Sequence, residues 1–417
     1  MNPTFLSWGI GLAATAGVIL RPFRWPEAIW AAAGALILVA LGLLPANLAW
    51  RAVGKGADVY LFLIGMMLLS ELGRREGLFD WIAVRVVNYA QESPRKLFLL
   101  VYLVGGIVTT FLSNDAAAVV LTPAVFAAAK KAQTKPLPLL YVCAFIANAA
   151  SFVLPISNPA NLVLYANHTP ALGLWIARFA WPSLLSIVAT FVMLRWTQRA
   201  DLTGSCACDL PVERLSTNGK LTLASMGVTA IVLLAVSALD LQLGLPTAIL
   251  GMITALVVSI KERQSPIELV SDISWSVLPL VAGLFVLVEM LDHTGVTREL
   301  SALLAQATRQ SQPMTAALSG LVIAFGSNAI NNLPAGLIAG ATALQAHSPE
   351  RVIDALLIGV DLGPNLSITG SLATILWLSS IRREGEEVSF TQFLKVGFAV
   401  MLPALVLALG ARLLIGR

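Results

Sequence analysis

The sequence predicts an all-α polytopic membrane protein built from two inverted repeats of five transmembrane helices, each with a re-entrant hairpin and a broken helix. Three observations support this fold class. The chain of 417 residues is 57% hydrophobic and only 12% charged, whereas a soluble domain carries about 25% charged residues. Apolar runs long enough to cross a hydrocarbon layer of about 30 Å recur throughout the chain. Short polar motifs interrupt these runs, and the motifs come in pairs.

The same composition argues against other classes of protein. The net charge of +4 does not indicate nucleic-acid binding, because the cations lie between the apolar runs, where they orient helices and meet lipid headgroups. The chain has no Walker motif and no His/Cys ligand cluster. We therefore expect no enzyme, no catalytic residue, no cofactor and no bound metal. Met1–Leu20 has no basic leader or cleavage site, so no cleavable signal is expected.

The N-terminal repeat is predicted to cover residues 1–196. It begins with apolar runs at 5–20, 27–45 and 58–73. Between Leu78 and Gln91, the segment FDWIAVRVVNYA places apolar residues on one face of a helix and Arg85 on the other. Such a helix is expected to lie in the membrane interface.

A re-entrant hairpin is predicted over residues 97–131. Two apolar arms meet at Ser113, Asn114 and Asp115, with at most one residue between them. This connection is too short for two full spans to turn in water. A turn within the membrane is tolerated only where protein or a hydrated cavity receives the unpaired backbone groups.

The first repeat closes with a broken helix at 139–166 and a span at 173–196. The motif PISNPAN interrupts the broken helix, because proline removes a backbone donor and blocks the helix. Residues 197–220 form a polar cytoplasmic linker. Its Cys206 and Cys208 resemble a thiol pair for a soft metal, but no third thiol lies near them. Cys143 is predicted to be a packing residue.

The C-terminal repeat, residues 221–417, is predicted to reproduce this order. Its hairpin covers 314–346 around the motif SNAINNLP, and its broken helix covers 352–378 around DLGPNLSITGS. Internal similarity supports the repeat, since three spaced residues recur 218 positions later: Gly65, Glu71 and Gly77 as Gly283, Glu289 and Gly295. We expect Glu71 and Glu289 to pair with cations at the membrane interface.

Five true spans in each half make the second half inverted relative to the first. The topology that places most Lys and Arg residues in inner loops puts both termini outside the cytoplasm. The sequence thus predicts a multi-pass protein of the cell (inner) membrane.

The four polar breaks are predicted to meet halfway through the membrane. Their half-helix ends would aim partial charges inward, and their amides and hydroxyls would line a site for a small polar solute or cation. Polar side chains in the middle of the membrane can also hydrogen-bond neighbouring helices to each other or cap helix ends. Asp115 and Asp361 are therefore either proton-coupling groups, since low dielectric favours a neutral carboxyl, or caps of the broken helices.

Three of these motifs resemble those of the arsenite efflux permeases of the ion transporter superfamily. The segments are FLSNDAAAVVLTP, INNLPAGLIAGA and DLGPNLSITGSLATILW, and the similarity extends from about Ala57 to the C-terminus. The resemblance implies two inverted repeats with a hairpin and a broken helix each. It also implies export of trivalent arsenite and antimonite by alternating access, driven by protons or, with a soluble ATPase partner, by ATP.

The resemblance and the polar breaks together give a set of candidate site residues. The substrate-binding candidates are Ser113, Asn114, Asn158, Asn161, Asn328, Asn331, Asn332, Thr369 and Ser371, and the proton-coupling candidates are Asp115 and Asp361. Arsenite near neutral pH is mostly an uncharged trihydroxide, which such a lining can hydrogen-bond. The same groups and unwound carbonyls suit Na⁺. A sodium-coupled dicarboxylate carrier or a sodium/proton antiporter therefore remains an alternative.

Overall fold

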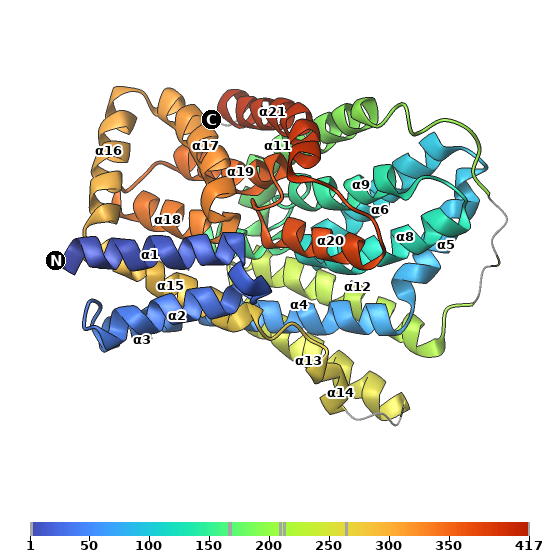
Figure 1. Cartoon of the computed structure of the whole chain (residues 1–417), viewed down its shortest axis with the longest axis horizontal. Coiled ribbons are helices and arrows are strands. Elements are labelled where there is room, and N and C mark those ends of the chain that lie inside the picture. Colours follow the sequence, from blue (N-terminus) through green and yellow to red (C-terminus); the bar gives the residue numbers. More distant parts are fainter. Residues whose placement is uncertain (1–2, 166–168, 208–210, 212–213, 263–265, 416–417) are drawn as a thin grey trace.

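In the computed structural model, helices are the regular secondary structure of the described residues, and no strand occurs in that part (Figure 1). The described residues are 3–165, 169–207, 211, 214–262 and 266–415. Cys208 lies outside them, so the predicted thiol pair cannot be placed.

The first half of the chain contains eleven numbered helices with short turns between them. They are α1 (Pro3–Leu20), α2 (Glu27–Ala40), α3 (Ala46–Lys55), α4 (Ala57–Arg75), α5 (Leu78–Ala90), α6 (Pro94–Leu112), α7 (Asn114–Ala116), α8 (Thr122–Lys131), α9 (Pro136–Ala149), α10 (Pro159–Tyr165) and α11 (Leu172–Thr197). A π-helical turn at Ala117–Leu121 joins α7 to α8, and a 3-10 turn at Pro155–Ser157 precedes α10.

The second half repeats this order. Its helices are α12 (Thr217–Ala238), α13 (Gly244–Glu262), α14 (Pro266–Ser271), α15 (Val277–His293), α16 (Val296–Gln310), α17 (Gln312–Ile330), α18 (Asn332–Gln345), α19 (Glu350–Leu362), α20 (Leu372–Arg383) and α21 (Phe390–Ile415), with a 3-10 turn at Gly363–Leu366 after α19. Among the described residues, seven helices are long and apolar enough to span a membrane, or up to nine if bent pairs are counted as one span.

These bounds confirm the predicted fold class. Interrupted pairs of helices lie in the segments predicted as hairpins and broken helices, while the predicted bounds of these units stay a prediction. The interface helix predicted at 78–91 is α5, and its counterpart α16 was not anticipated. The sequence analysis also missed α3. The apolar run 27–45 is helical only as far as Ala40, and α3 begins at Ala46 after a turn. The division into repeats at 196 and 221 remains a proposal.

The helices form two groups, which lie in the lower and upper parts of Figure 1. In the lower group, which we call the frame, α4 packs against α13 and α2 packs against α15. In the upper group, which we call the core, the hairpins and broken helices pack with α11 and α21. The amphipathic helices α5 and α16 follow the frame helices α4 and α15 and pack on the hairpins.

Equivalent glycines allow the two frame pairs to approach closely. A Cβ on Gly65 of α4 would lie 2.2 Å from the carbonyl oxygen of Thr247 in α13, and a Cβ on Gly283 of α15 would lie 2.6 Å from the backbone of Ala31 in α2. Such contacts are typical of membrane helices, where small residues let backbones meet. The pairing α4–α13 becomes α15–α2 when the halves are exchanged, as an internal two-fold relation requires.

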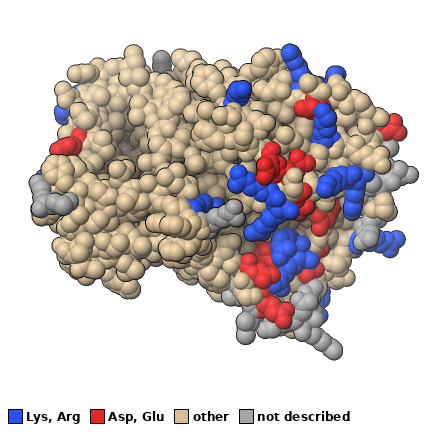
Figure 2. Space-filling model, viewed as in Figure 1, with Lys and Arg blue, Asp and Glu red and all other residues tan. Residues whose placement is uncertain are grey.

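Charged side chains gather over the right-hand half of the face shown in Figure 2. At the end of α4, Glu71 pairs with Arg74 at 2.5 Å and with Arg75 at 3.2 Å, while Glu289 pairs with Lys55 at 2.6 Å. The expected pairing of the two glutamates with cations is confirmed. Outside the spans, a hydrogen bond from Arg75 holds the pKa of Asp272 below its usual range.

Candidate functional site

The tip of the first hairpin is a single-residue reversal. Helix α6 ends at Leu112, Ser113 has a φ of 110°, and the chain continues directly into α7. Asn114 is buried, and its Oδ1 accepts a hydrogen bond from the backbone N–H of Asp115 at 2.9 Å. The half-buried carboxyl group of Asp115 has no hydrogen-bond partner among the described residues. This tip therefore presents a carboxyl group and an amide that the fold leaves largely unused.

The tip of the second hairpin is built in the same way. Asn331 adopts a φ of 73°, and its side chain accepts from the N–H of Leu333 at 3.3 Å, which caps α18. The N–H of Asn332 donates to the carbonyl of Gly370 at 2.8 Å. The side chain of Asn332 is buried and makes no hydrogen bond within the described part of the chain.

The second hairpin is tied to the unwound segment of its own repeat through Asn328. Its Nδ2 donates to the carbonyl of Gly363 at 2.9 Å, and its Oδ1 accepts from the hydroxyl of Ser367 at 2.7 Å. The hydroxyl of Thr369 donates to the backbone carbonyl of Asn328 at 3.0 Å. Asn328 and Thr369 are thus already hydrogen-bonded within the protein. A substrate could bind their polar groups only by replacing these hydrogen bonds.

The first broken helix is stabilised by Asn161. Its Nδ2 donates to three carbonyls of the unwound segment, those of Ser151 (2.8 Å), Leu154 (3.2 Å) and Pro155 (3.3 Å). Its buried Oδ1 has no partner among the described residues. The amide N–H groups of Asn161 thus satisfy the backbone carbonyls that proline leaves unpaired, so its structural role is explicit.

Asn158 and Asp361 join the two halves. The Nδ2 of Asn158 donates to Oδ1 of Asp361 at 2.8 Å, and both side chains are buried. The side chain of Ser151 also faces this carboxyl group, but its hydroxyl donates to the carbonyl of Asn148 at 2.8 Å. Oδ2 of Asp361 is left buried without a hydrogen-bond partner in the described structure. A buried polar atom of this kind needs an explanation, such as a proton or a bound solute.

Asn148 is a site residue that sequence reasoning missed. Its Nδ2 donates to Oδ1 of Asn365 at 3.0 Å, and its Oδ1 accepts from the hydroxyl of Ser371 at 3.3 Å. Ser371 also caps α20 by accepting from the N–H of Thr374 at 3.1 Å. Asn148 and Asn365 are 217 residues apart, close to the repeat offset. An asparagine near the end of an apolar run was therefore a usable signal.

The two hairpins and two breaks meet in one interlocked region. The first hairpin contacts α20 of the second repeat, and α18 of the second hairpin contacts α10 of the first. Ser157 adds a bond from its hydroxyl to the carbonyl of Thr110 in α6 at 2.9 Å. Asn114 and Asn331 are both buried in protein rather than exposed to lipid. The predicted residues therefore lie in the predicted segments, while their transport roles remain predictions.

The ion pairs of the region place positive charge away from these breaks. At one end of the core, Asp354 is fully buried and bonds both the guanidinium of Arg412, at 2.6 Å, and the hydroxyl of Tyr165. Arg178 lies 3.8 Å from Asp354 and 2.5 Å from Glu350. The sequence analysis missed this cluster. Asp354 within an apolar helix was the available signal.

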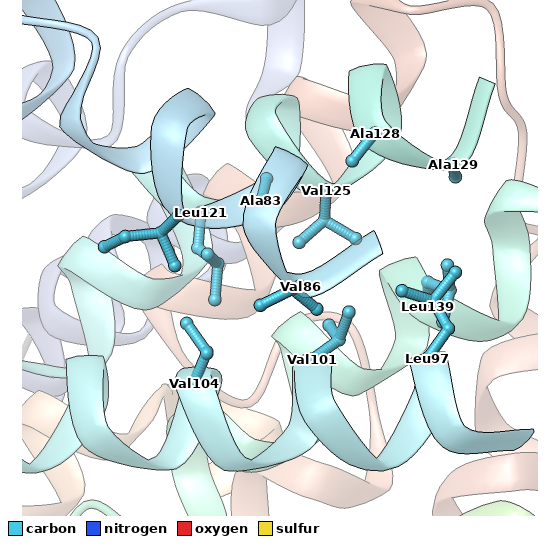
Figure 3. Close-up of a pocket in the computed structure, with 11 residues that line it drawn as sticks. Ala83, Val86, Leu97, Val101, Val104, Leu121, Val125, Ala128, Ala129 and Leu139 are labelled. Atoms are coloured by element: carbon cyan, nitrogen blue, oxygen red, sulfur yellow. The ribbon is translucent and has the colours of Figure 1, made fainter. Parts of the chain in front are cut away.

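The small cavity in Figure 3 is not this site. It has a volume of about 10 Å³ between α5, α6 and α8, and only apolar side chains line it. Val101 and Val104 of α6 point toward Val86 of α5 in that view. A polar solute would find no hydrogen-bond partner there.

A family model described as citrate transporter, CitMHS, matches residues 16–360 of the chain. The chain belongs to the citrate transporter family. This family member is also similar to an arsenical pump membrane protein of Escherichia coli, with 28% identity over 97% of this chain and 93% of that protein. An arsenical pump membrane protein of Yersinia enterocolitica is 27% identical over 88% of this chain and 86% of its own length.

Two further similarities extend over most of this citrate transporter family member. An uncharacterized transporter of Mycobacterium tuberculosis is 26% identical over 90% of both chains. The crystal structure of the Alcanivorax borkumensis YdaH transporter, described as having an unusual topology, shares the fold. It matches with a TM-score of 0.59 and 16% identity, covering 99% of this chain and 98% of that one. The protein is thus a membrane transporter of the arsenical pump and CitMHS type.

Proposed function

We propose that this transporter exports trivalent arsenite and antimonite from the cytoplasm in exchange for protons. The observation that carries the proposal is the pair of carboxyl groups, those of Asp115 and Asp361, whose oxygens the described fold leaves wholly or partly without hydrogen bonds. A carboxyl group in low dielectric favours the protonated form. Proton release and proton uptake at such a group can therefore alternate with binding of a hydroxylated metalloid.

The surrounding groups suit an uncharged trihydroxide. The side chains of Asn114 and Asn332 lie at the hairpin tips, and each retains an unused amide N–H among the described contacts. Arg178 of α11 and Arg412 of α21, two arginines within the core, are both engaged by acidic side chains. A neutral substrate needs no counter-ion, so a site whose described residues offer two acidic groups and no cation at the breaks favours it over a carboxylate.

Movement of the core against the frame would provide alternating access. The densest helix packing lies within each group, whereas the connections through α5 and α16 are single amphipathic helices. We place the end that carries α5 and the 197–220 linker in the cytoplasm, with both termini outside and the protein in the cell (inner) membrane. The transported species would be protons and the metalloid, and membrane lipids would surround the spans. A soluble ATPase partner would bind on the side of the 197–220 linker.

The test is metalloid flux in proteoliposomes, with pH and sodium gradients imposed separately. We expect flux of arsenite and antimonite that follows the pH gradient and ignores sodium. Asp361→Asn and Asp115→Asn should each abolish the proton-driven component, because the amide cannot exchange a proton. Asp240→Asn is the matched control, since Asp240 is exposed at the end of α12, and it should transport like the native protein.

A second candidate function follows from the family description, which names citrate. Sodium-driven citrate or dicarboxylate uptake, with no response to arsenite, would replace the metalloid proposal by a carboxylate carrier. Sodium/proton exchange without either solute would indicate an antiporter. Full proton-driven arsenite flux in both aspartate variants would keep the substrate and remove the proposed coupling role.

A further inference from the structure

A second cavity lies between α16, α17 and α18, and Leu356 of α19 also lines it. Its volume is about 430 Å³, within the usual range of ligand pockets. Five polar residues line it, namely Gln310, Ser311, Thr315, Ser319 and Thr342, but the other lining residues are apolar and include Leu300 and Leu304 of α16, Val322 of α17 and Ala339 of α18. It is therefore unsuited to a hydroxylated metalloid and requires a different occupant.

This cavity is the counterpart of the one in Figure 3. The helices α5, α6 and α8 of the first repeat correspond to α16, α17 and α18, yet they enclose only about 10 Å³. Equivalent lining positions differ in side-chain size. In the order of the chain, the first repeat has Leu97, Val101 and Leu121, and the second repeat has Thr315, Ser319 and Ala339. The same backbone arrangement is thus filled in one repeat and hollow in the other.

The hollow opens toward the lipid. Three residues of its lining, Leu303, Met314 and Leu318, are 63%, 59% and 53% exposed. An empty cavity loses the dispersion contacts of its apolar lining, and water filling it would leave that apolar surface hydrated, which is unfavourable. Acyl chains are the apolar molecules available at this surface.

The polar end of the cavity has the chemistry of a lipid headgroup site. Gln310 and Ser311 line it where α16 meets α17. The neighbouring Arg309 is exposed and forms no ion pair within the described residues. Helix α16 runs across the direction of α15 (Figure 1), at a bend of 72°, as expected of an amphipathic helix at the membrane surface.

We propose that the second repeat binds one anionic phospholipid, with an acyl chain in the cavity between α16, α17 and α18 and the phosphate at Arg309. From Met314 to Val322 the lining follows α17 for eight residues, about 12 Å at 1.5 Å per residue. That depth suits the upper part of an acyl chain entering from the membrane surface. The lipid would support the contact between the connecting helix α16 and the hairpin.

The first experiment is photolabelling of the native protein. A phosphatidylglycerol with a diazirine on its acyl chain, reconstituted with the transporter, should label peptides within 300–323. The equivalent peptides within 82–104, whose apolar side chains meet lipid only at the surface, should be labelled several-fold less. Equal labelling of the two regions, or none in 300–323, would overturn the proposal. Cross-linking of 300–323 to a second copy of the chain would identify a protein interface instead, and would also overturn it.

The second experiment fills the cavity with the side chains of the first repeat. The variant Ser319→Val/Ala339→Leu should abolish labelling within 300–323, and it should also abolish thermal stabilisation of the detergent-solubilised protein by phosphatidylglycerol. Ala302→Leu is the matched control, because Ala302 is exposed on α16 outside the lining, and it should label like the native protein. Unchanged labelling of a folded, filled variant would contradict the proposal. If that variant fails to fold, labelling of the native protein decides.

A charge variant tests the headgroup. Phosphatidylglycerol should stabilise the native protein against heat more than phosphatidylcholine with the same acyl chains does. In Arg309→Gln, the two lipids should stabilise the protein equally. Arg298→Gln, a change of another exposed cation on α16, should preserve the preference. A preference that survives Arg309→Gln, or that is absent in the native protein, would remove the assignment of the phosphate to Arg309.

Discussion

The two ends of the core have equivalent backbones but different chemistry. At one end, Tyr165 of α10 donates to the carboxylate of Asp354, which also binds Arg412. At the other end, the corresponding residue is Trp377 of α20, whose Nε1 donates to the carbonyl of Leu140 at 2.8 Å. The first end combines a buried charge cluster with packed rings, since Tyr165 also contacts the ring of Trp175 with centroids 5.6 Å apart, whereas the second relies on packed rings. Repetition thus preserved the helix positions while the side chains diverged.

At the aromatic end, the described side chains include no buried charge. Trp377 stacks on Tyr141 with centroids 5.8 Å apart, and Phe393 stacks on Phe145 at 5.1 Å. Such pairs gain from burial and ring geometry without a desolvation cost for ions. The charged end depends on complete pairing, since an uncompensated charge in this environment is expensive. The difference predicts that single substitutions at the two ends have unequal consequences.

The largest effect is expected for Asp354→Ala. It leaves Arg412 buried without its carboxylate, a loss that costs about 3–5 kcal/mol in buried pairs. SDS-induced unfolding in mixed micelles measures the free-energy change. The double change Asp354→Leu/Arg412→Met should recover most of it, because it removes both charges. A small effect of Asp354→Ala would show that the charged end does not depend on pairing.

A smaller effect is expected for Tyr165→Phe, which removes one hydroxyl from the charged end. A hydrogen bond to a charged group contributes about 1.5–3 kcal/mol, so unfolding should become easier by that amount. The matched variant is Tyr141→Phe at the aromatic end, where the described hydroxyl makes no hydrogen bond, and it should cost about 0.5 kcal/mol or less. Equal costs at both ends would contradict the comparison.

Substitutions at two equivalent glycines test whether the two halves of the chain also differ in the frame. Gly65→Ala and Gly283→Ala each place a methyl group against the backbone of the partner helix, at 2.2 Å and 2.6 Å. Overpacking costs about 1–3 kcal/mol, and the shorter distance predicts the larger loss for Gly65→Ala. Both are read from the same unfolding assay. Alanine at the open Gly9 of α1 should be tolerated, and a cost at Gly9 equal to that at Gly65 would contradict the contact argument.

The smallest effects are expected for the interfacial glutamates. Glu71→Gln removes pairing with two arginines, and Glu289→Gln removes pairing with one lysine that is 60% exposed. Exposed pairs contribute about 0–1 kcal/mol, so both changes should be small, with the larger cost at Glu71. Raising the salt concentration should reduce the difference between the variants. A larger cost for Glu289→Gln would reverse this ranking.

Much of the fold was predictable because hydrophobic length and polar interruption are local signals. The apolar runs that lead to Ser113 and to Asn331 each end at a residue with positive φ, and the polar motifs at these positions predicted both hairpins. Helix α3 escaped notice because its apolar stripe covers only ten residues. The candidate site was predicted at the level of segments. Individual roles were harder to predict, since Asn161 binds the backbone of its own break whereas Asn158 reaches the other repeat.

Composition and spacing along the chain were enough to identify a membrane protein, to reveal two similar halves, and to locate the four segments at which helices are interrupted. These features follow from composition, period and spacing, which require no knowledge of neighbours. The folded arrangement was needed to show that Asn148 bonds Asn365, that Asp354 binds Tyr165 and Arg412, and that one of two equivalent three-helix arrangements is hollow. Each of these depends on contacts between residues distant along the chain, and on the sizes of side chains that no local pattern relates.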